Sequence, residues 1–238
     1  MCTNFTPTKR AQWVKENLQV DLPADFPEES YPGFAAPIVI QSHQSGRVAC
    51  GLAKFGLIPS WAKNDKIGRH TYNARSKTAA EKPSYRDAWR QRQQQYGLVL
   101  VDNFYEPSYE LGRAVRWRIE LACGDPFGIA CLWDRSTDPA SGEQVVSFSM
   151  LTFNADEHPV MRQFHKPGDE KTHPSHHYGR NARHLARCRC RPGGRAHDLV
   201  PHARSAGHAS SAKLKATLPL AVGVDQGVAH RWFEALSG

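Results

Sequence analysis

Short apolar segments, rich in β-branched and aromatic residues, recur along residues 1–171. Each is bounded by Gly, Pro, Ser or Asp, which is the pattern of strands separated by turns. Six strands are predicted on this basis: APIVIQ (36–41), VACGLAKFG (48–56), GLVLVDNFYE (97–106), VRWRIEL (115–121), FGIACLWD (127–134) and VVSFSMLTFN (145–154).

Helices are fewer. Thr6-Pro7 has the form of an N-cap followed by proline at the first helical position, which predicts a helix through Trp13 to about Leu18. SYRDAWRQRQQQ (84–95) predicts a second helix, capped by Ser84. Because strands outnumber helices and do not alternate with them, we expect an α+β fold. It has a β-rich mixed sheet or barrel core with peripheral helices over residues 1–171.

The pattern changes after Lys171. Residues 172–238 are rich in Arg, His and Ala, contain eight of the twelve histidines, and show no strand or helix period before LKATLPLAVGV (214–224). Such a composition predicts a poorly ordered, irregular tail. Back-translation of THPSHHYGRN, read one base later, permits a strand-like string of the type R-[IT]-P-V-I-I. We therefore hypothesise a frameshift near Glu170–Thr172, which the nucleotide sequence would test.

Charge changes the picture little. The net charge is +8, but residues 172–238 contain 10 Lys and Arg against 3 Asp and Glu, so residues 1–171 are close to neutral. Any affinity of residues 1–171 for DNA must then come from a local patch of positive charge.

No apolar run is long enough to span a membrane, and no secretory signal is present. The expected location is the cytoplasm, with the six cysteines as free thiols and no metal or cofactor. The Cys188-x-Cys190 spacing fits zinc poorly.

Four local motifs carry candidate chemistry. They are Met1-Cys2, HTYNARSK (70–77), VDNFYEP (101–107) and NADEHPVMRQFHKPGDEK (154–171). Taken singly, each is weak, since an isolated Asn, Glu or His is usually structural. Together, in this order and spacing, they resemble the SRAP family, the SOS response-associated peptidases that process abasic sites in DNA. FGLIPSWA (55–62) and ACLWD (130–134) add to the resemblance.

The resemblance implies a bacterial protein, nucleoid-associated when bound, that reacts with single-stranded DNA containing an abasic site. After removal of Met1, Cys2 carries an α-amine beside a thiol, with ordinary pKa values near ~8 and ~8.5. The amine can form an imine with the aldehyde of the opened sugar, and the thiol can close a thiazolidine ring, giving a DNA–protein cross-link. The resemblance also implies an associated autopeptidase activity and a monomer.

The resemblance also implies roles for the residues that match the motifs of the SRAP family. Glu106 and His165 would act as acid and base, and Asn73 would hydrogen-bond around Cys2 and hold its amine. The expected DNA contacts are Arg75 to a phosphate, Trp61 with Pro59 as an apolar wedge beside unstacked bases, and Ser76. His158, in DEHP, is expected beside a helix start and not as a second base.

The chain also departs from the family pattern. MCTN replaces MCGR, Lys77 replaces a glutamate, Asn103 replaces a glycine, Pro107 replaces a tryptophan, and the Arg-Met-Pro strand after His165 is missing. Loss of that strand predicts an unpaired sheet edge. Two alternatives therefore stay open. One is a single-stranded DNA-binding module that has lost cross-linking. The other is a general cysteine peptidase using Cys2 and His165.

Overall fold

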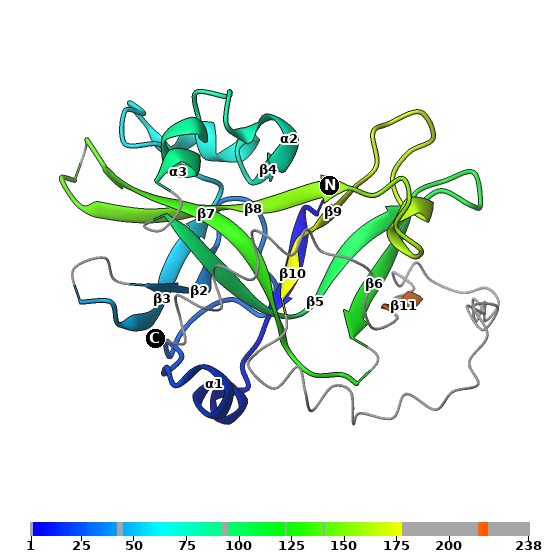
Figure 1. The fold of residues 1–238 in the computed structure, drawn as a ribbon, viewed down its shortest axis with the longest axis horizontal. Helices are drawn as coiled ribbons and strands as arrows, with labels where there is room; N and C mark the ends of the chain where they lie inside the picture. The colour runs from blue at the N-terminus through cyan, green and yellow to red at the C-terminus, as the bar shows by residue number, and fades with distance from the viewer. Residues whose placement is uncertain are drawn as a thin grey trace.

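A computed structural model describes residues 2–41, 45–91, 95–121, 123–139, 141–177 and 214–218. Strands dominate it (Figure 1). The strands are β1 (Asn4–Pro7), β2 (Ala35–Gln41), β3 (Val48–Phe55), β4 (Asn73–Arg75), β5 (Tyr96–Ser108), β6 (Val115–Leu121), β7 (Phe127–Thr137), β8 (Gln144–Asn154), β9 (Thr172–Pro174), β10 (His176–His177) and β11 (Leu214–Leu218). The helices are α1 (Ala11–Leu18), α2 (Ser76–Ala79) and α3 (Arg86–Arg90), with 3-10 turns η1 (Asp65–His70) and η2 (Met161–Gln163).

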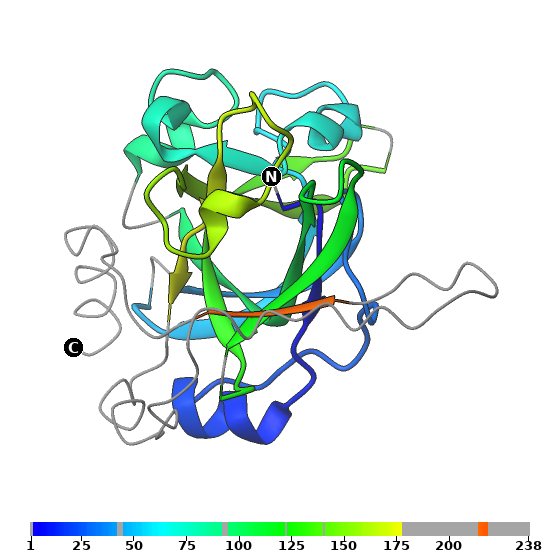
Figure 2. The ribbon, with the colours of Figure 1, turned by 90° about the vertical axis from the view of Figure 1, so that its right-hand side faces the viewer.

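Five strands close on themselves into a barrel. The order β7-β8-β3-β2-β5 is completed by pairing between β5 and β7, so the central strands leave no open edge (Figure 2). The sheet is mixed, because β8 runs parallel to both β3 and β4 and the other barrel pairs are antiparallel. Shorter strands extend it: β1 and β6 flank β5, and β9 adds to β8. The predicted α+β class with a β-rich core is confirmed.

All six predicted strands are present with nearly the predicted bounds, as β2, β3, β5, β6, β7 and β8. Four short strands, β1, β4, β9 and β10, were not predicted. Each has four residues or fewer. So short a segment has no readable period, and it is extended only because a longer strand supplies its hydrogen-bond partners.

Both predicted helices need correction, the first at its start and the second at both ends. Thr6-Pro7 does not open a helix but ends β1, where Phe5 pairs with Phe104 on β5, and α1 begins only at Ala11. Pairing along β5 and burial of Phe5 override the local capping signal. In the second case α3 spans Arg86–Arg90, its N-cap is Tyr85, and Ser84 does not cap it.

The helices cover the outside of the barrel at opposite ends (Figures 1 and 2). Val14 of α1 packs with Val39, Leu98 and Leu100 of β2 and β5. At the other end, Ala79 of α2 and Ala88 of α3 pack with a cluster that includes Leu132 and Leu151 of β7 and β8. No helix in the described ranges is both long and apolar enough to cross a bilayer.

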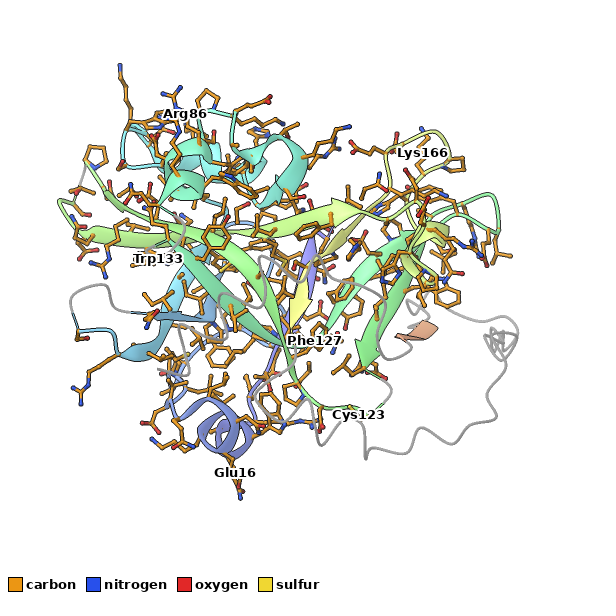
Figure 3. The ribbon with its side chains drawn as sticks, in the orientation of Figure 1. Glu16, Arg86, Cys123, Phe127, Trp133 and Lys166 are labelled. Carbon is orange, nitrogen blue, oxygen red and sulfur yellow. The ribbon has the colours of Figure 1, made fainter. Side chains whose placement is uncertain are left out.

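The barrel interior is filled by aromatic and aliphatic side chains. Phe5, Phe55 and Phe148 form one aromatic group, in which the Phe55 and Phe148 rings stack with centroids 5.1 Å apart. Figure 3 shows Phe127 among the strands, whereas Glu16 of α1 extends into solvent. Cys2 belongs to this interior cluster. The N-terminal residues are therefore part of the core and not a free arm.

The segment after His165 differs from expectation. The sequence predicts an irregular tail from residue 172 and an unpaired sheet edge, yet Thr172–Pro174 forms β9 against β8 and His176–His177 forms β10 against β7. Strand pairing to the barrel therefore continues past Lys171, through residues 172–177. Leu214–Leu218, from the run with a readable period, is β11 and lies parallel to β6. The rest of the predicted tail, with Cys188 and Cys190, lies outside the described residues.

Candidate functional site

Cys2 and Asn73 meet at one end of the barrel. Antiparallel pairing of Asn4 with Tyr105 brings the N-terminal residues alongside the strand that carries Glu106. Asn73 reaches the same point from β4, which pairs in parallel with β8. Its Nδ2 donates to the Cys2 carbonyl oxygen at 2.8 Å, while its Oδ1 is buried and has no hydrogen-bond partner within the described structure. Asn73 is thus placed to fix the Cys2 backbone and has one amide oxygen left to accept a further hydrogen bond.

Glu106 lies on β5 opposite Trp117 of β6 and is almost completely buried. Burial disfavours its ionised form and raises the pKa of its carboxyl group from the ordinary value of 4.5 to about 7. At neutral pH the protonated and ionised forms are therefore both well populated. A carboxyl group with this pKa can donate and accept a proton within one reaction cycle.

His165 approaches Glu106 from the segment after η2. Its backbone N–H donates to the Pro107 carbonyl at 3.0 Å, which ties it to the residue that follows Glu106. The φ angle of His165 is +73°, a left-handed conformation that is uncommon for a residue with a side chain. The imidazole Nδ1 lies 3.5 Å from Oε2 of Glu106. Backbone strain at such a contact is typical of functional sites.

The second ring nitrogen of His165 determines its tautomer. Nε2 lies 2.6 Å from the Thr172 carbonyl oxygen, which can only accept, so Nε2 carries the hydrogen. In the neutral ring Nδ1 then presents a lone pair to Glu106. Burial lowers the pKa of His165, which favours this neutral form. Glu106 and His165 can therefore hold one proton between them at neutral pH.

The Cys2 sulfur is less acidic than the sequence suggests. Cys2 is completely buried, and burial together with the nearby Glu106 carboxylate raises the thiol pKa well above its ordinary range. Burial therefore favours the thiol over the thiolate in this structure. Any reaction of this sulfur would need a neighbouring base to accept the thiol proton.

Of the two residues predicted to form an apolar wedge, Trp61 and Pro59, only Trp61 is exposed. Trp61 is 52% exposed, whereas Pro59 is buried and supports the loop from below. The Ser60 N–H donates to Asp134 at 3.2 Å, and the Ile58 N–H donates to Ser147 at 2.8 Å. These two hydrogen bonds hold the residues on both sides of Pro59 against β7 and β8, and Trp61 follows directly after them.

The start of this loop depends on a close backbone approach. Gly56, at the end of β3, has φ +113°, and a Cβ atom there would lie 2.2 Å from the Gly68 carbonyl oxygen. Any side chain at position 56 would displace η1, which contains Gly68. The glycine of FGLIPSWA is therefore required by packing.

Arg75 and Ser76 follow Asn73 directly. Arg75 ends β4 and forms an ion pair with Glu170, with both side chains more than a third exposed. Ser76 is half-buried and begins α2. His158 lies just before η2, where its Nδ1 accepts hydrogen bonds from the backbone N–H groups of Val160 and Met161. Its predicted position beside a helix start is confirmed.

Several groups at the site were not predicted from the sequence. The carbonyls of Thr172 and Pro107 hold His165, and the Tyr85 hydroxyl donates to the Asn73 carbonyl at 3.0 Å. The two carbonyls belong to the backbone, so the type of residue at positions 107 and 172 does not indicate their role. Within the part of the chain that the structure describes, no group of three His, Cys, Asp or Glu side chains could hold a metal ion.

Known proteins resemble this chain over the same region. The family model described as SOS response associated peptidase (SRAP) matches residues 1–167. The Bacillus subtilis (strain 168) protein named abasic site processing protein YoqW is 29% identical over 171 residues, covering 69% of this chain and 73% of that protein. Abasic site processing protein YoaM of the same organism is 32% identical over 143 residues, covering 57% and 60%. A crystal structure from Bordetella bronchiseptica is 30% identical with a TM-score of 0.65, covering 73% of this chain and 82% of that one.

Proposed function

Because the chain belongs to the SOS response-associated peptidase family, we propose that it is an abasic-site processing protein that cross-links single-stranded DNA through Cys2. The observation that supports this most strongly is the meeting of Cys2, Asn73, Glu106 and His165 at one end of the barrel. These residues come from four separate segments of the chain. A buried carboxyl group with a raised pKa beside a histidine and a cysteine is typical of functional sites.

The reaction begins after Met1 is removed and Cys2 has a free α-amine. The amine nitrogen attacks the aldehyde carbon of the ring-opened abasic sugar and forms a carbinolamine. Protonated Glu106 donates its proton to the departing hydroxyl group, which leaves as water, and the protonated imine (iminium) forms beside the Glu106 carboxylate. Burial raises the pKa of the Glu106 carboxyl group, which favours the protonated form that this step needs.

Ring closure uses the same groups in reverse. The Cys2 sulfur forms a bond to the iminium carbon, and the C=N π electrons pass to nitrogen, which becomes a neutral secondary amine that keeps its one hydrogen. The thiol proton is taken by the Glu106 carboxylate, because the raised pKa of the Cys2 thiol prevents earlier ionisation. Aldehyde and aminothiol thus become thiazolidine and one water. His165 Nδ1 lies next to Glu106 and would accept a hydrogen bond from its protonated carboxyl group before the first step and after the second.

Asn73 and the surface residues would serve binding and orientation. The Asn73 amide fixes the Cys2 carbonyl, and its Oδ1 is available to accept a hydrogen bond from the new α-amine. Trp61 would stack against an unpaired base beside the lesion. Arg75 would exchange its exposed Glu170 partner for a phosphate, an exchange that costs little because exposed ion pairs are weak.

A denaturing gel tests the proposal. Purified protein is incubated with labelled single-stranded oligonucleotides that do or do not contain an abasic site, after intact-mass measurement has established whether Met1 is absent. We expect a heat-stable adduct only with the abasic strand, and none with Cys2→Ala. Cys2→Ser, which can close only the oxygen ring, should give little stable product. DNA retention without an adduct would instead favour the binding module.

Peptide hydrolysis without DNA would favour the cysteine peptidase. The geometry gives that alternative less support, because Nε2 of His165 is bonded to Thr172 and Nδ1 is directed at Glu106. A cysteine–histidine nucleophile needs one ring nitrogen in hydrogen-bond reach of the sulfur. The hydrogen bonds of the Cys2 sulfur are with the Asn4 and Tyr105 backbones.

A further inference from the structure

Glu29, in the segment before β2, contacts the chain next to Cys2. The Asn4 amide Nδ2 donates to Glu29 Oε2 at 3.2 Å, and Asn4 is almost fully buried. Asn4 is the second residue after Cys2. Glu29 is therefore linked to the predicted nucleophile through a single side chain and one intervening residue.

Glu29 is itself held by three further donors. Oε2 accepts from Arg116 Nη2 at 2.8 Å and from the Tyr31 hydroxyl at 2.7 Å, and Oε1 accepts from the Tyr105 hydroxyl at 3.3 Å. The Arg116 guanidinium carbon lies 3.5 Å from the centre of the Tyr105 ring. Burial acts to raise the pKa of Glu29, but the bonds from Tyr31 and Arg116 outweigh it and lower the pKa. At neutral pH Glu29 is thus a carboxylate with a fixed orientation.

The backbone strengthens this link. Phe5 N–H donates to the Ser30 carbonyl at 3.2 Å, and Ser30 N–H donates to the Phe5 carbonyl at 2.9 Å. Consecutive residues 29 and 30 therefore bind consecutive residues 4 and 5 on one edge of β1, while β5 pairs with the other edge. Tyr105, which donates to Glu29, directly precedes Glu106. One carboxylate thus bonds the first residue of β1, which follows Cys2 closely, and the strand that carries its proposed acid.

We propose that Glu29 is a positioning residue for the reaction at Cys2, an inference that rests on the proposed function. After Met1 is removed, Cys2 is the terminal residue, and chain ends are poorly ordered unless they are tied down. Asn73 holds the Cys2 carbonyl from one side, and Glu29 holds Asn4 from the other. Without Glu29, the amine and thiol lose their fixed distance to Glu106.

Single-turnover cross-linking measures this role. The rate is followed at increasing concentrations of abasic single-stranded DNA, which separates the rate at saturation from the half-saturating concentration. For Glu29→Ala we expect a saturating rate lower by about tenfold or more, since small misplacements of reacting groups are costly, with little change in half-saturation. Asn4→Ala should give a similar loss. The double variant should be no slower than either single one, because both remove the same link.

Two further variants distinguish positioning from general damage. In Glu29→Gln the amide oxygen can replace Oε2 and the amide nitrogen can face the Tyr105 hydroxyl oxygen, so most of the rate should return. Glu28→Ala is the matched control, because Glu28 neighbours Glu29, has the same charge and pairs with exposed Lys9. It should react at the wild-type rate.

Amide hydrogen exchange supplies a readout that needs no DNA. Exchange at Asn4 and Phe5 should accelerate in Glu29→Ala and not in Glu28→Ala. A Glu29→Ala protein with wild-type exchange there, or with a wild-type saturating rate, overturns the inference while the proposed function stands. An adduct missing from the wild type overturns the proposed function, and the role of Glu29 in that reaction with it.

Discussion

Nδ1 of His165 lies 3.5 Å from Oε2 of Glu106, and the other ring nitrogen of His165 is fixed by a backbone carbonyl. This arrangement leaves the histidine lone pair directed at a carboxyl group whose pKa is raised by burial to about 7. Glu106 also lies close enough to Cys2 to raise the pKa of its thiol.

Replacement of Glu106 by Gln should slow cross-linking by about 100-fold or more, because general acid–base groups contribute roughly that much. Retention of abasic DNA should be unchanged, since Gln has the same shape. Cross-linking rates and a filter-binding assay on the same preparation check this. A variant that reacts at the wild-type rate would contradict the role assigned to Glu106.

The pH profile of cross-linking should be bell-shaped. The rate should fall above about pH 7 as Glu106 loses the proton it donates. It should also fall toward acid, because an α-amine with a pKa of about 8 becomes a non-nucleophilic ammonium. Glu106→Gln should lose the alkaline limb and keep the acid one. Single-turnover rates between pH 5 and pH 9 measure both limbs, and an unchanged alkaline limb in the variant would assign it to another group.

Folding stability should respond to the same carboxyl group. Its folded pKa of about 7 lies above the ordinary 4.5, so the native state binds the proton more tightly than the unfolded state. This contribution is complete below pH 4.5 and is lost as pH rises from 4.5 through about 7. Urea unfolding across this window should show a smaller decline for Glu106→Gln than for the wild type. Equal declines would place the titration elsewhere.

Asn73→Ala should lower both stability and reactivity. Loss of the buried bond to the Cys2 carbonyl should cost about 1–2 kcal/mol of unfolding free energy. The saturating cross-linking rate should fall by about tenfold, because the amine is held less firmly. Asn17→Ala is the control, since Asn17 also donates to a backbone carbonyl, that of Trp13 on α1. It should not affect the rate, and an equal fall in both variants would indicate a general effect on the fold.

Substitutions of Arg75 and of Glu170 should have opposite effects on DNA binding. Arg75→Gln should weaken binding and reduce the salt slope by about one, as expected for the loss of one phosphate contact. Glu170→Gln should strengthen binding, because it releases the Arg75 guanidinium from its ion pair. Asp21→Asn changes the net charge by the same amount at a remote pair with Lys15 and is the matched control. Equal gains for Glu170→Gln and Asp21→Asn would reduce the effect to net charge alone.

Trp61→Ala should weaken binding of single-stranded DNA by about 1–3 kcal/mol, the usual contribution of one stacked base. Its effect on folding should be small, because half of the side chain is exposed. Leu52→Ala, at a similarly exposed apolar side chain on β3, should bind normally. Titrations by fluorescence anisotropy compare the two, and indistinguishable affinities would remove Trp61 from the DNA contact.

Much of the fold was readable because long strands carry their own signal. β5 has thirteen residues and β8 eleven, and both are apolar enough to be predicted with nearly the observed bounds. β1 and β9 were not, because their few residues are extended only through pairing with β5 and β8. The helix predicted from Thr6-Pro7 failed for the same reason, since a local capping signal is weaker than a strand pairing that buries Phe5.

The sequence by itself determined which residue types are available for the chemistry: a cysteine behind the initiator methionine, an asparagine, a glutamate and a histidine in a recognisable order. Only the tertiary structure decided their states. Burial, which depends on the whole barrel, raises the pKa of Glu106 and of the Cys2 thiol. The carbonyl of Thr172 fixes the His165 tautomer, and Glu29 reaches Asn4 across the sheet. These properties come from contacts between segments distant in the chain, and no local pattern encodes such contacts.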